Sequence, residues 1–189
     1  MTTPLLLAIY NRASLEEIQE LINAQLDINK VEMNSGLTPL MMAIIYHPKA
    51  IPLLMAHSQL DVNKMEQDGK TALFFAALEG VDLSPFLAHP KIDVNAQDEY
   101  GDTALYYTIL YNRHSTINQL LADPRTDLNL KNMFGRTAVG KIEVNRPKLL
   151  PLFRREILTL MAPKVIPRLM GTSATRLPTE IMFQLNKML

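Results

Sequence analysis

The chain has 189 residues, 19 basic and 19 acidic side chains, no cysteine, and 48% apolar residues, a composition typical of a folded globular domain. Without cysteine, the chain has no disulfides, thiolate nucleophiles or cysteine-bound zinc. Its longest apolar runs, 40–46 and 72–78, are much shorter than the roughly 18 residues of a membrane-spanning helix. The first residues also lack the basic side chains of a signal peptide, so we expect a cytoplasmic protein without a membrane span.

The net charge of zero conceals an asymmetry along the chain. Residues 1–135 carry 9 basic and 16 acidic side chains, whereas residues 136–189 carry 10 basic and 3 acidic ones. This difference predicts that the two parts of the chain meet different partners.

Two short motifs recur four times in the first three quarters of the chain. A Gly-x-Thr motif, followed by Pro or Ala, begins at positions 36, 69, 101 and 135. An Asp-x-Asn motif begins at positions 27, 61, 93 and 127, always shortly before the next Gly-x-Thr. Two interlocked series with the same spacing predict an internal repeat of about 33 residues.

Each repeat has the pattern of a turn followed by two helices. The glycine suits a turn with positive φ, and the threonine is expected to cap a short first helix, with Pro at its first position in the copy that begins at Gly36. A second helix is expected around an apolar pair, found at 21–22, 54–55, 86–87 and 120–121. Neither helix can bury its apolar side within one repeat, so the repeats are expected to stack into a solenoid.

These residues resemble the ankyrin repeat family, whose pattern is D-x-x-G-x-T-P-L-H-x-A followed by a Leu-Leu pair. The resemblance covers residues 1–145: a first copy begins at Thr3-Pro4, and a fifth unit begins at Phe134. It implies an all-α ankyrin solenoid of about five units. The basic residues 146–189 that follow are expected, from their own apolar spacing, to form a helical C-terminal region. The histidine of the motif is replaced in every copy, by Leu6, Met41, Phe74, Tyr106 and Gly140. We therefore expect apolar packing in place of the hydrogen bond that this histidine makes in the family.

No pattern typical of catalysis appears in the sequence. Gly69-Lys70-Thr71 resembles the end of a phosphate-binding loop, but Lys64 stands where that loop needs a glycine. His57 and His89 hold equivalent positions about one helix-packing distance apart, which is too far to share a metal ion, and are expected to be solvated residues at helix ends. We expect no enzymatic activity, no metal, no cofactor and no small-molecule substrate.

The resemblance also implies a candidate binding surface. In ankyrin repeats, the turn tips and the exposed side of each first helix line a concave surface. In this chain, large apolar residues hold many of these positions, namely Tyr10, Ile45, Tyr46, Leu78, Tyr100, Leu110, Tyr111 and Phe134. An apolar surface rimmed by acidic residues is typical of protein binding. The alternative is that some of these rings pack onto the adjacent helices.

After Gly140 the repeat pattern stops. Apolar residues from Leu149 to Met161 follow a helical spacing, and Arg154 and Arg155 lie on the other side of the predicted helix. One interpretation is a helical cap that closes the open end of the solenoid. The excess of positive charge also allows binding to anionic lipid or nucleic acid, although few aromatic residues accompany it.

The last 13 residues, from Leu177, begin with L-P-x-E-I and predict an amphipathic helix. They resemble the opening helix of the F-box, in the shortened form that ends poxvirus ankyrin proteins and some ankyrin effectors of intracellular bacteria. The resemblance implies binding to the Skp-type adaptor of a cullin ubiquitin ligase. If the protein is an effector or a viral protein, it would meet this adaptor in the cytosol of the host cell. The expected contact residues are Leu177, Pro178, Ile181, Leu185 and Leu189. The other interpretation is a scaffold or inhibitor whose last helices only cap the repeats.

Overall fold

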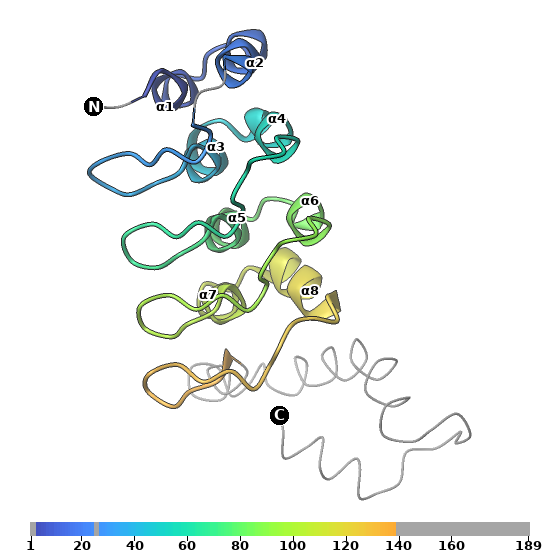
Figure 1. The fold of residues 1–189 in the computed structure, drawn as a ribbon. Helices are drawn as coiled ribbons and strands as arrows, with labels where there is room; N and C mark the ends of the chain where they lie inside the picture. Colours follow the sequence, from blue (N-terminus) through green and yellow to red (C-terminus); the bar gives the residue numbers. More distant parts are fainter. Residues whose placement is uncertain (1–2, 25–26, 139–189) are drawn as a thin grey trace, which may run out of the picture.

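The computed structural model describes residues 3–24 and 27–138, which form a stack of helix pairs joined by projecting hairpin loops (Figure 1). The first helices of the pairs form one layer: α1 (Pro4–Tyr10), α3 (Pro39–Tyr46), α5 (Ala72–Glu79) and α7 (Ala104–Leu110). Each packs against the next, α1 on α3, α3 on α5 and α5 on α7. This architecture confirms the predicted all-α solenoid of stacked helix pairs. The expected helical region 146–189 and its terminal helix lie outside the described residues.

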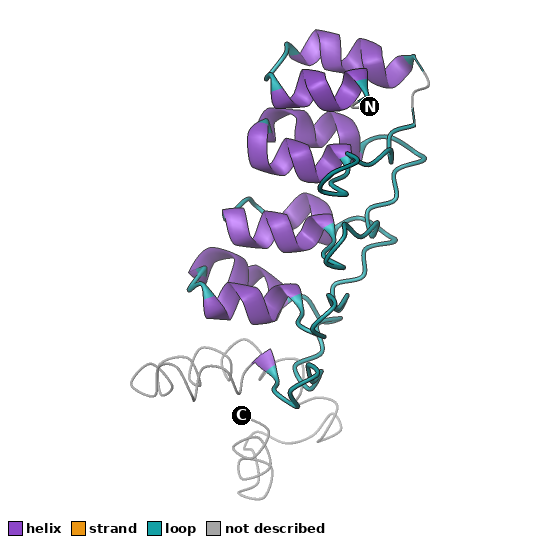
Figure 2. Ribbon diagram, turned by 90° about the vertical axis from the view of Figure 1, so that its left-hand side faces the viewer, coloured by secondary structure: helices purple, strands orange, loops and turns teal. Residues whose placement is uncertain are grey.

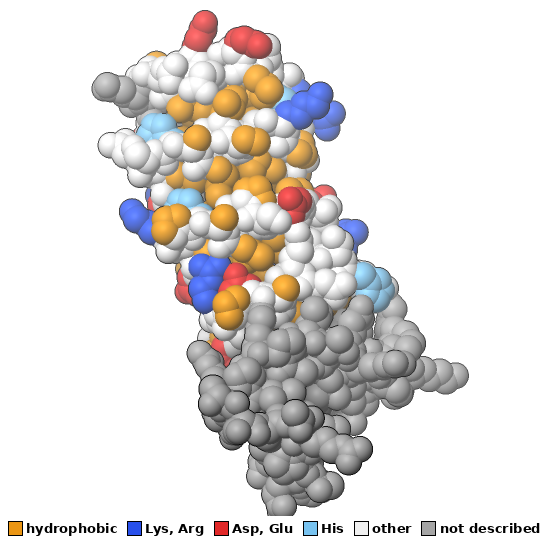
Figure 3. Space-filling view, turned by 90° about the vertical axis from the view of Figure 1, so that its right-hand side faces the viewer, with side chains coloured by type: hydrophobic (Ala, Val, Ile, Leu, Met, Phe, Trp, Pro, Cys, Tyr) orange, Lys and Arg blue, Asp and Glu red, His pale blue; other side chains and the backbone are white. Residues whose placement is uncertain are grey.

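The second helices form the other layer, and the hairpin loops all project to one side (Figure 2). This layer contains α2 (Leu15–Asn23), the 3-10 turn η1 (Pro48–Ala50) with α4 (Ile51–Met55), α6 (Ser84–Leu87) and α8 (His114–Ala122). Helices α4 and α6 are short, have proline in the first turn and carry no charged residue. Figure 3 shows the face formed by the second helices, where apolar side chains gather along the middle of the stack.

Threonine side chains begin most of the first helices, as predicted. The hydroxyl oxygen of Thr38 accepts a hydrogen bond of 3.2 Å from the N–H of Met41, and Thr3 and Thr103 make the equivalent contact. Thr71 is the exception among the four, and here the prediction of a side-chain cap is wrong. The N–H of Phe74 donates instead to the backbone carbonyl of Thr71 at 3.0 Å, a tighter start of the helix that leaves the hydroxyl unused.

The core lies between the two layers and between successive repeats. The residues that replace the motif's histidine, Leu6, Met41, Phe74 and Tyr106, are all buried. The burial of Leu6 and Phe74 agrees with apolar packing in place of the histidine hydrogen bond, whereas Sδ of Met41 accepts a bond of 3.4 Å from the N–H of Thr38. Gly140 lies outside the described residues. Every predicted apolar pair of a second helix has at least one fully buried member.

The Asp-x-Asn motif joins each repeat to the next through its asparagine side chain. The Asn95 amide donates to the carbonyl oxygen of Arg125 at 2.8 Å, and its oxygen accepts from the N–H of Asp127 at 2.8 Å. Asn63 and Asn29 make the same pair of contacts one and two repeats earlier, respectively. We call this pair of contacts the asparagine clamp. It accounts for the second series of motifs in the sequence.

One side chain at the base of each hairpin closes the loop. Oδ1 of Asp98 accepts from the N–H groups of Tyr100 and Asp102, and Glu66 and Asn132 do the same in their hairpins. The first hairpin has one extra residue: the N–H of Glu32 donates to Leu37, five residues later, whereas that of Asp98 donates to Asp102, four residues later. Glu32 nevertheless accepts from the loop N–H groups of Asn34 and Ser35.

Candidate functional site

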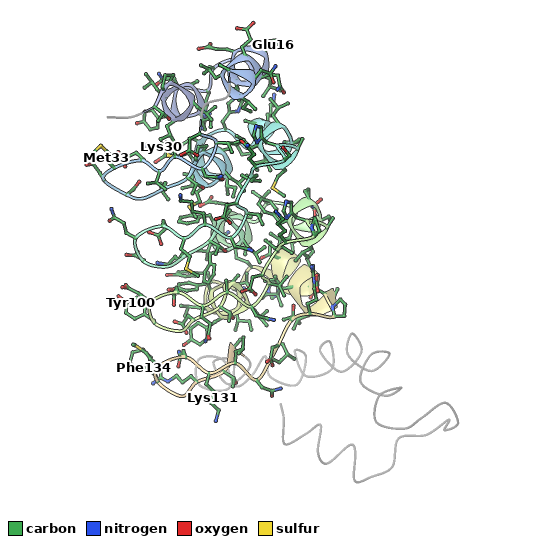
Figure 4. The ribbon with its side chains drawn as sticks, viewed as in Figure 1. Glu16, Lys30, Met33, Tyr100, Lys131 and Phe134 are labelled. Carbon is green, nitrogen blue, oxygen red and sulfur yellow. The ribbon has the colours of Figure 1, made fainter. Side chains whose placement is uncertain are left out.

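Large apolar side chains are exposed along the hairpin tips and the first helices. Met33, Tyr100 and Phe134 lie at successive places along one edge of the stack, where the hairpins end (Figure 4). Among the residues that the structure describes, eight large apolar ones are between 44% and 70% exposed: Leu7, Tyr10, Met33, Met65, Tyr100, Tyr111, Met133 and Phe134. Most of them belong to the tips or to helices α1 and α7 and their ends. The tips and the first helices therefore form the candidate site, which we call the concave surface.

None of the eight residues predicted for this surface is buried. Tyr10, Tyr100, Tyr111 and Phe134 are exposed. Ile45, Tyr46, Leu78 and Leu110 are half-buried, and Tyr46 and Leu110 also pack against the core. The two interpretations of the sequence thus apply to different residues: the first four are available for contact, whereas Tyr46 and Leu110 have a packing role as well.

Tyrosines cluster at both ends of the described stack. The rings of Tyr10 and Tyr46 meet edge to face, with centroids 5.0 Å apart, which explains why Tyr46 is only half exposed. At the other end, the rings of Tyr107 and Tyr111 stack with centroids 6.3 Å apart and planes 9° apart. These contacts hold aromatic surface in a fixed orientation, an arrangement that lowers the entropy cost of binding a partner.

The Tyr107 ring is also held from the hairpins. Its hydroxyl donates to Oδ2 of Asp98 at 2.7 Å, and the Lys70 ammonium lies 5.8 Å from the ring centroid. Burial, together with the hydrogen bond to the Asp98 carboxylate, raises the pKa of Tyr107. Lys70 in turn pairs with Asp68 at 3.1 Å. The tip of one hairpin is therefore linked to the helix of the next repeat.

Sequence reasoning missed several residues of the concave surface. Leu7, Met33 and Met65 are exposed there but were not predicted, whereas Met133 is exposed at a turn tip to which the repeat pattern assigns it. Leu7 could have been found, because it follows Thr3 by four residues as Tyr107 follows Thr103, and both spacings place a side chain on the same side of a first helix. Met33 could not, because the extra residue in its hairpin shifts the expected pattern.

The described residues show few groups that could carry chemistry. Within residues 3–24 and 27–138, no three His, Asp or Glu side chains lie close enough together to hold a metal ion. The Nδ1 atoms of His57 and His89 each accept a hydrogen bond from a backbone N–H in the turn that follows, as expected for residues at helix ends. No helix in this part of the chain is both long and apolar enough to cross a membrane.

The predicted adaptor-binding residues, Leu177, Pro178, Ile181, Leu185 and Leu189, all lie outside the described residues. Their assignment therefore still rests on the sequence alone.

Comparison with known proteins agrees with this architecture. Residues 46–132 match the family model for ankyrin repeats, in three copies. A crystal structure of EF0377, an ankyrin repeat protein, is similar over 87% of this chain and 82% of that protein, with a TM-score of 0.71 and 22% sequence identity. No curated protein matches the sequence. Residues 46–132 are therefore ankyrin repeats, and the chain has the fold of an ankyrin repeat protein.

Proposed function

We propose that this ankyrin repeat protein is a non-catalytic adaptor, which holds a protein target on its concave surface and binds a Skp-type ubiquitin-ligase adaptor through its C-terminal helix. Ankyrin repeats are modules of protein–protein interaction, and this coarser role follows from the repeats themselves. The finer proposal adds a surface for each partner and a cytoplasmic setting in which both would be met.

The observation that carries target binding is the row of exposed apolar side chains on the concave surface. Aromatic residues such as Tyr100, Tyr111 and Phe134 are exposed to water, and burying their apolar surface against a partner is favourable. Scattered apolar residues are normal on a protein surface, but here exposed apolar residues gather at three of the four hairpin tips and at the surfaces of α1 and α7. Such gatherings are typical of contact surfaces for proteins.

Exchanging Tyr100 and Tyr111 together for alanine tests this role. Both rings are exposed, so the double variant should keep its helical content and melting temperature. It should lose the proteins that the unchanged chain retains from eukaryotic cytosol, identified by quantitative mass spectrometry. Asn118→Ala, on the exposed side of α8 in the other layer, is the control and should retain the same proteins. Equal retention by the double variant would show that the binding surface is elsewhere.

The second half of the proposal is supported by the L-P-x-E-I string and the apolar row that follows it. Leu177, Ile181 and Leu185 are spaced by four residues, so a helix would present them together to a groove. Mixed at tens of micromolar, the purified protein and a Skp-type adaptor should co-elute, because a contact with a dissociation constant of about 1 μM would be almost saturated. Leu177→Ala with Pro178→Ala should abolish co-elution without lowering the melting temperature.

Two other results would contradict binding of the Skp-type adaptor and would favour a different role for the C-terminal segment. If the segment only caps the repeats of a scaffold or inhibitor, the double change should lower the melting temperature and the unchanged protein should not bind the adaptor. If the excess positive charge of residues 136–189 serves binding, anionic vesicles or nucleic acid should bind at about 150 mM salt, with an affinity that falls steeply as salt rises.

A further inference from the structure

Each first helix carries two residues on the side that faces the concave surface, at equivalent positions in every repeat, although Met42 is itself buried. These are the fourth and eighth residues after the threonine that begins the helix, and they lie on the same side because helical neighbours are four residues apart. The pairs are Leu7 with Asn11, Met42 with Tyr46, Phe75 with Glu79, and Tyr107 with Tyr111. The second member of each pair forms a line that crosses the repeats: Asn11, Tyr46, Glu79, Tyr111.

Glu79 is the one acidic residue in this line, and it stands between two tyrosines. Tyr46 belongs to the repeat before it and Tyr111 to the repeat after it. Since α3 packs on α5 and α5 packs on α7, successive members of the line are about one helix-packing distance apart, about 8 to 10 Å. A group bound to the Glu79 carboxylate therefore has an aromatic side chain on either side of it.

The surroundings of Glu79 do not explain it as a stabilising residue. It is exposed, and it is the last residue of α5, where a negative charge interacts unfavourably with the helix dipole. Within residues 3–24 and 27–138, its carboxylate makes no hydrogen bond or ion pair. Lys70, a cation of the hairpin that precedes α5, is engaged by Asp68 and the Tyr107 ring.

We propose that Glu79, with Tyr46 and Tyr111 on either side, binds an arginine side chain of the protein target. An arginine fits all three groups, because its planar guanidinium binds a carboxylate through two hydrogen bonds and stacks on tyrosine rings. The overall charge agrees: the described residues carry sixteen acidic and ten basic side chains, so they attract a basic segment. This inference rests on the proposed target binding and specifies the chemistry of the target.

A peptide selection tests the inference without knowledge of the natural target. A phage-displayed library of random peptides of about 16 residues is selected on the immobilised full-length protein. The selected peptides should share an arginine, and one of them, synthesised with a fluorescent label, serves as the probe for anisotropy titrations. Glu79→Gln should weaken its binding about tenfold or more, since it leaves the guanidinium without its charged partner.

Matched changes separate the site from general charge. Glu20→Gln removes an equally exposed acidic residue from α2, in the other layer, and should change the affinity less than about twofold, because it makes only a long-range contribution. A peptide with its shared arginine replaced by lysine should bind more weakly than the original. With that arginine replaced by glutamine, Glu79→Gln should have no further effect, because the two changes remove the same contact.

The results distinguish this inference from the proposed function. Selected peptides without a common arginine, or an arginine peptide insensitive to Glu79→Gln, would overturn the arginine site. If binding of those peptides is still lost on exchanging Tyr100 and Tyr111 for alanine, target binding at the concave surface stands. If no peptide is selected, the arginine site is rejected, and target binding is judged by the retention experiment with cytosolic proteins.

Discussion

The hydroxyl of Tyr107 donates a hydrogen bond of 2.7 Å to the carboxylate of Asp98, which closes the hairpin before its helix. The other oxygen of this carboxylate holds the loop, so one side chain fixes the hairpin and orients the ring next to Tyr111. The phenol can donate this bond only while it is protonated. The stability of the repeat is therefore linked to the titration of Tyr107.

This link predicts a loss of stability at high pH. The pKa of Tyr107 is raised in the folded protein above its ordinary value of 10.0, so the unfolded chain loses this proton first as the pH rises. The folded state then binds more protons, and the free energy of unfolding should fall above about pH 10. Tyr107→Phe should make that fall shallower in urea titrations between about pH 9 and pH 11, whereas Tyr10→Phe controls for the loss of a phenol. An unchanged slope in Tyr107→Phe would contradict the link.

Leu105 tests the repeat register. It is 2% exposed, between successive repeats, so Leu105→Ala should lower the free energy of unfolding by about 2 to 5 kcal/mol through lost burial and a cavity. Leu7→Ala makes the same chemical change on a side chain that is 51% exposed, and it should cost less than about 1 kcal/mol. Chemical denaturation followed by circular dichroism measures both. Similar losses in the two variants would show that the register is wrong.

Thr71 and Thr103 should respond oppositely to valine. The Thr103 hydroxyl accepts from the N–H of Tyr106, so Thr103→Val should cost about 0.5 to 2 kcal/mol as a lost cap. The buried hydroxyl of Thr71 has no hydrogen-bond partner among the described residues, so Thr71→Val should be neutral or should raise the stability. Thermal denaturation of the two single variants decides between these outcomes. A loss for Thr71→Val as large as that for Thr103→Val would mean that the hydroxyl has a partner.

The asparagine clamp predicts a cost for removing one side chain at a junction. Asn95→Ala deletes two hydrogen bonds to the next repeat and should lower the free energy of unfolding by about 1 to 2 kcal/mol, because each exposed bond contributes modestly. Asn118→Ala, in the exposed part of α8, is the control and should be neutral or slightly stabilising, since alanine favours helix. Urea denaturation measures the difference. Equal stability of the two variants would show that the clamp contributes nothing.

Much of the fold could be predicted because the repeat imposes the same local chemistry several times. The turn glycines, the capping threonines and the buried replacements of histidine all follow from residue type and spacing. The unused hydroxyl of Thr71 could not be predicted, since Thr71 and Thr103 occupy the same place in their motifs and differ only in the geometry of the first turn. The function of the asparagine in Asp-x-Asn was also missed, because its partners are about 30 residues away in the sequence.

The concave surface was predicted less completely than the fold. Position in the repeat identified Tyr100, Tyr111 and Phe134, all of which are exposed. It could not show that Tyr46 is half covered, because that depends on the edge-to-face contact with Tyr10 in a different repeat. The exposure of a side chain depends on its neighbours in space, and the motif of a single repeat does not identify neighbours that come from another repeat.

The extra residue in the first hairpin shows that the length of a hairpin on the concave surface can vary. Glu32 closes its loop as Asp98 closes the shorter one, and its contacts are with the loop itself. Helix α3, which follows this hairpin, has an ordinary cap at Thr38 that the longer loop does not disturb. Loop length is thus uncoupled from the integrity of the stack. A foreign peptide inserted beside Met33 should be displayed by a scaffold that still folds, so this hairpin is the natural place to graft a new specificity.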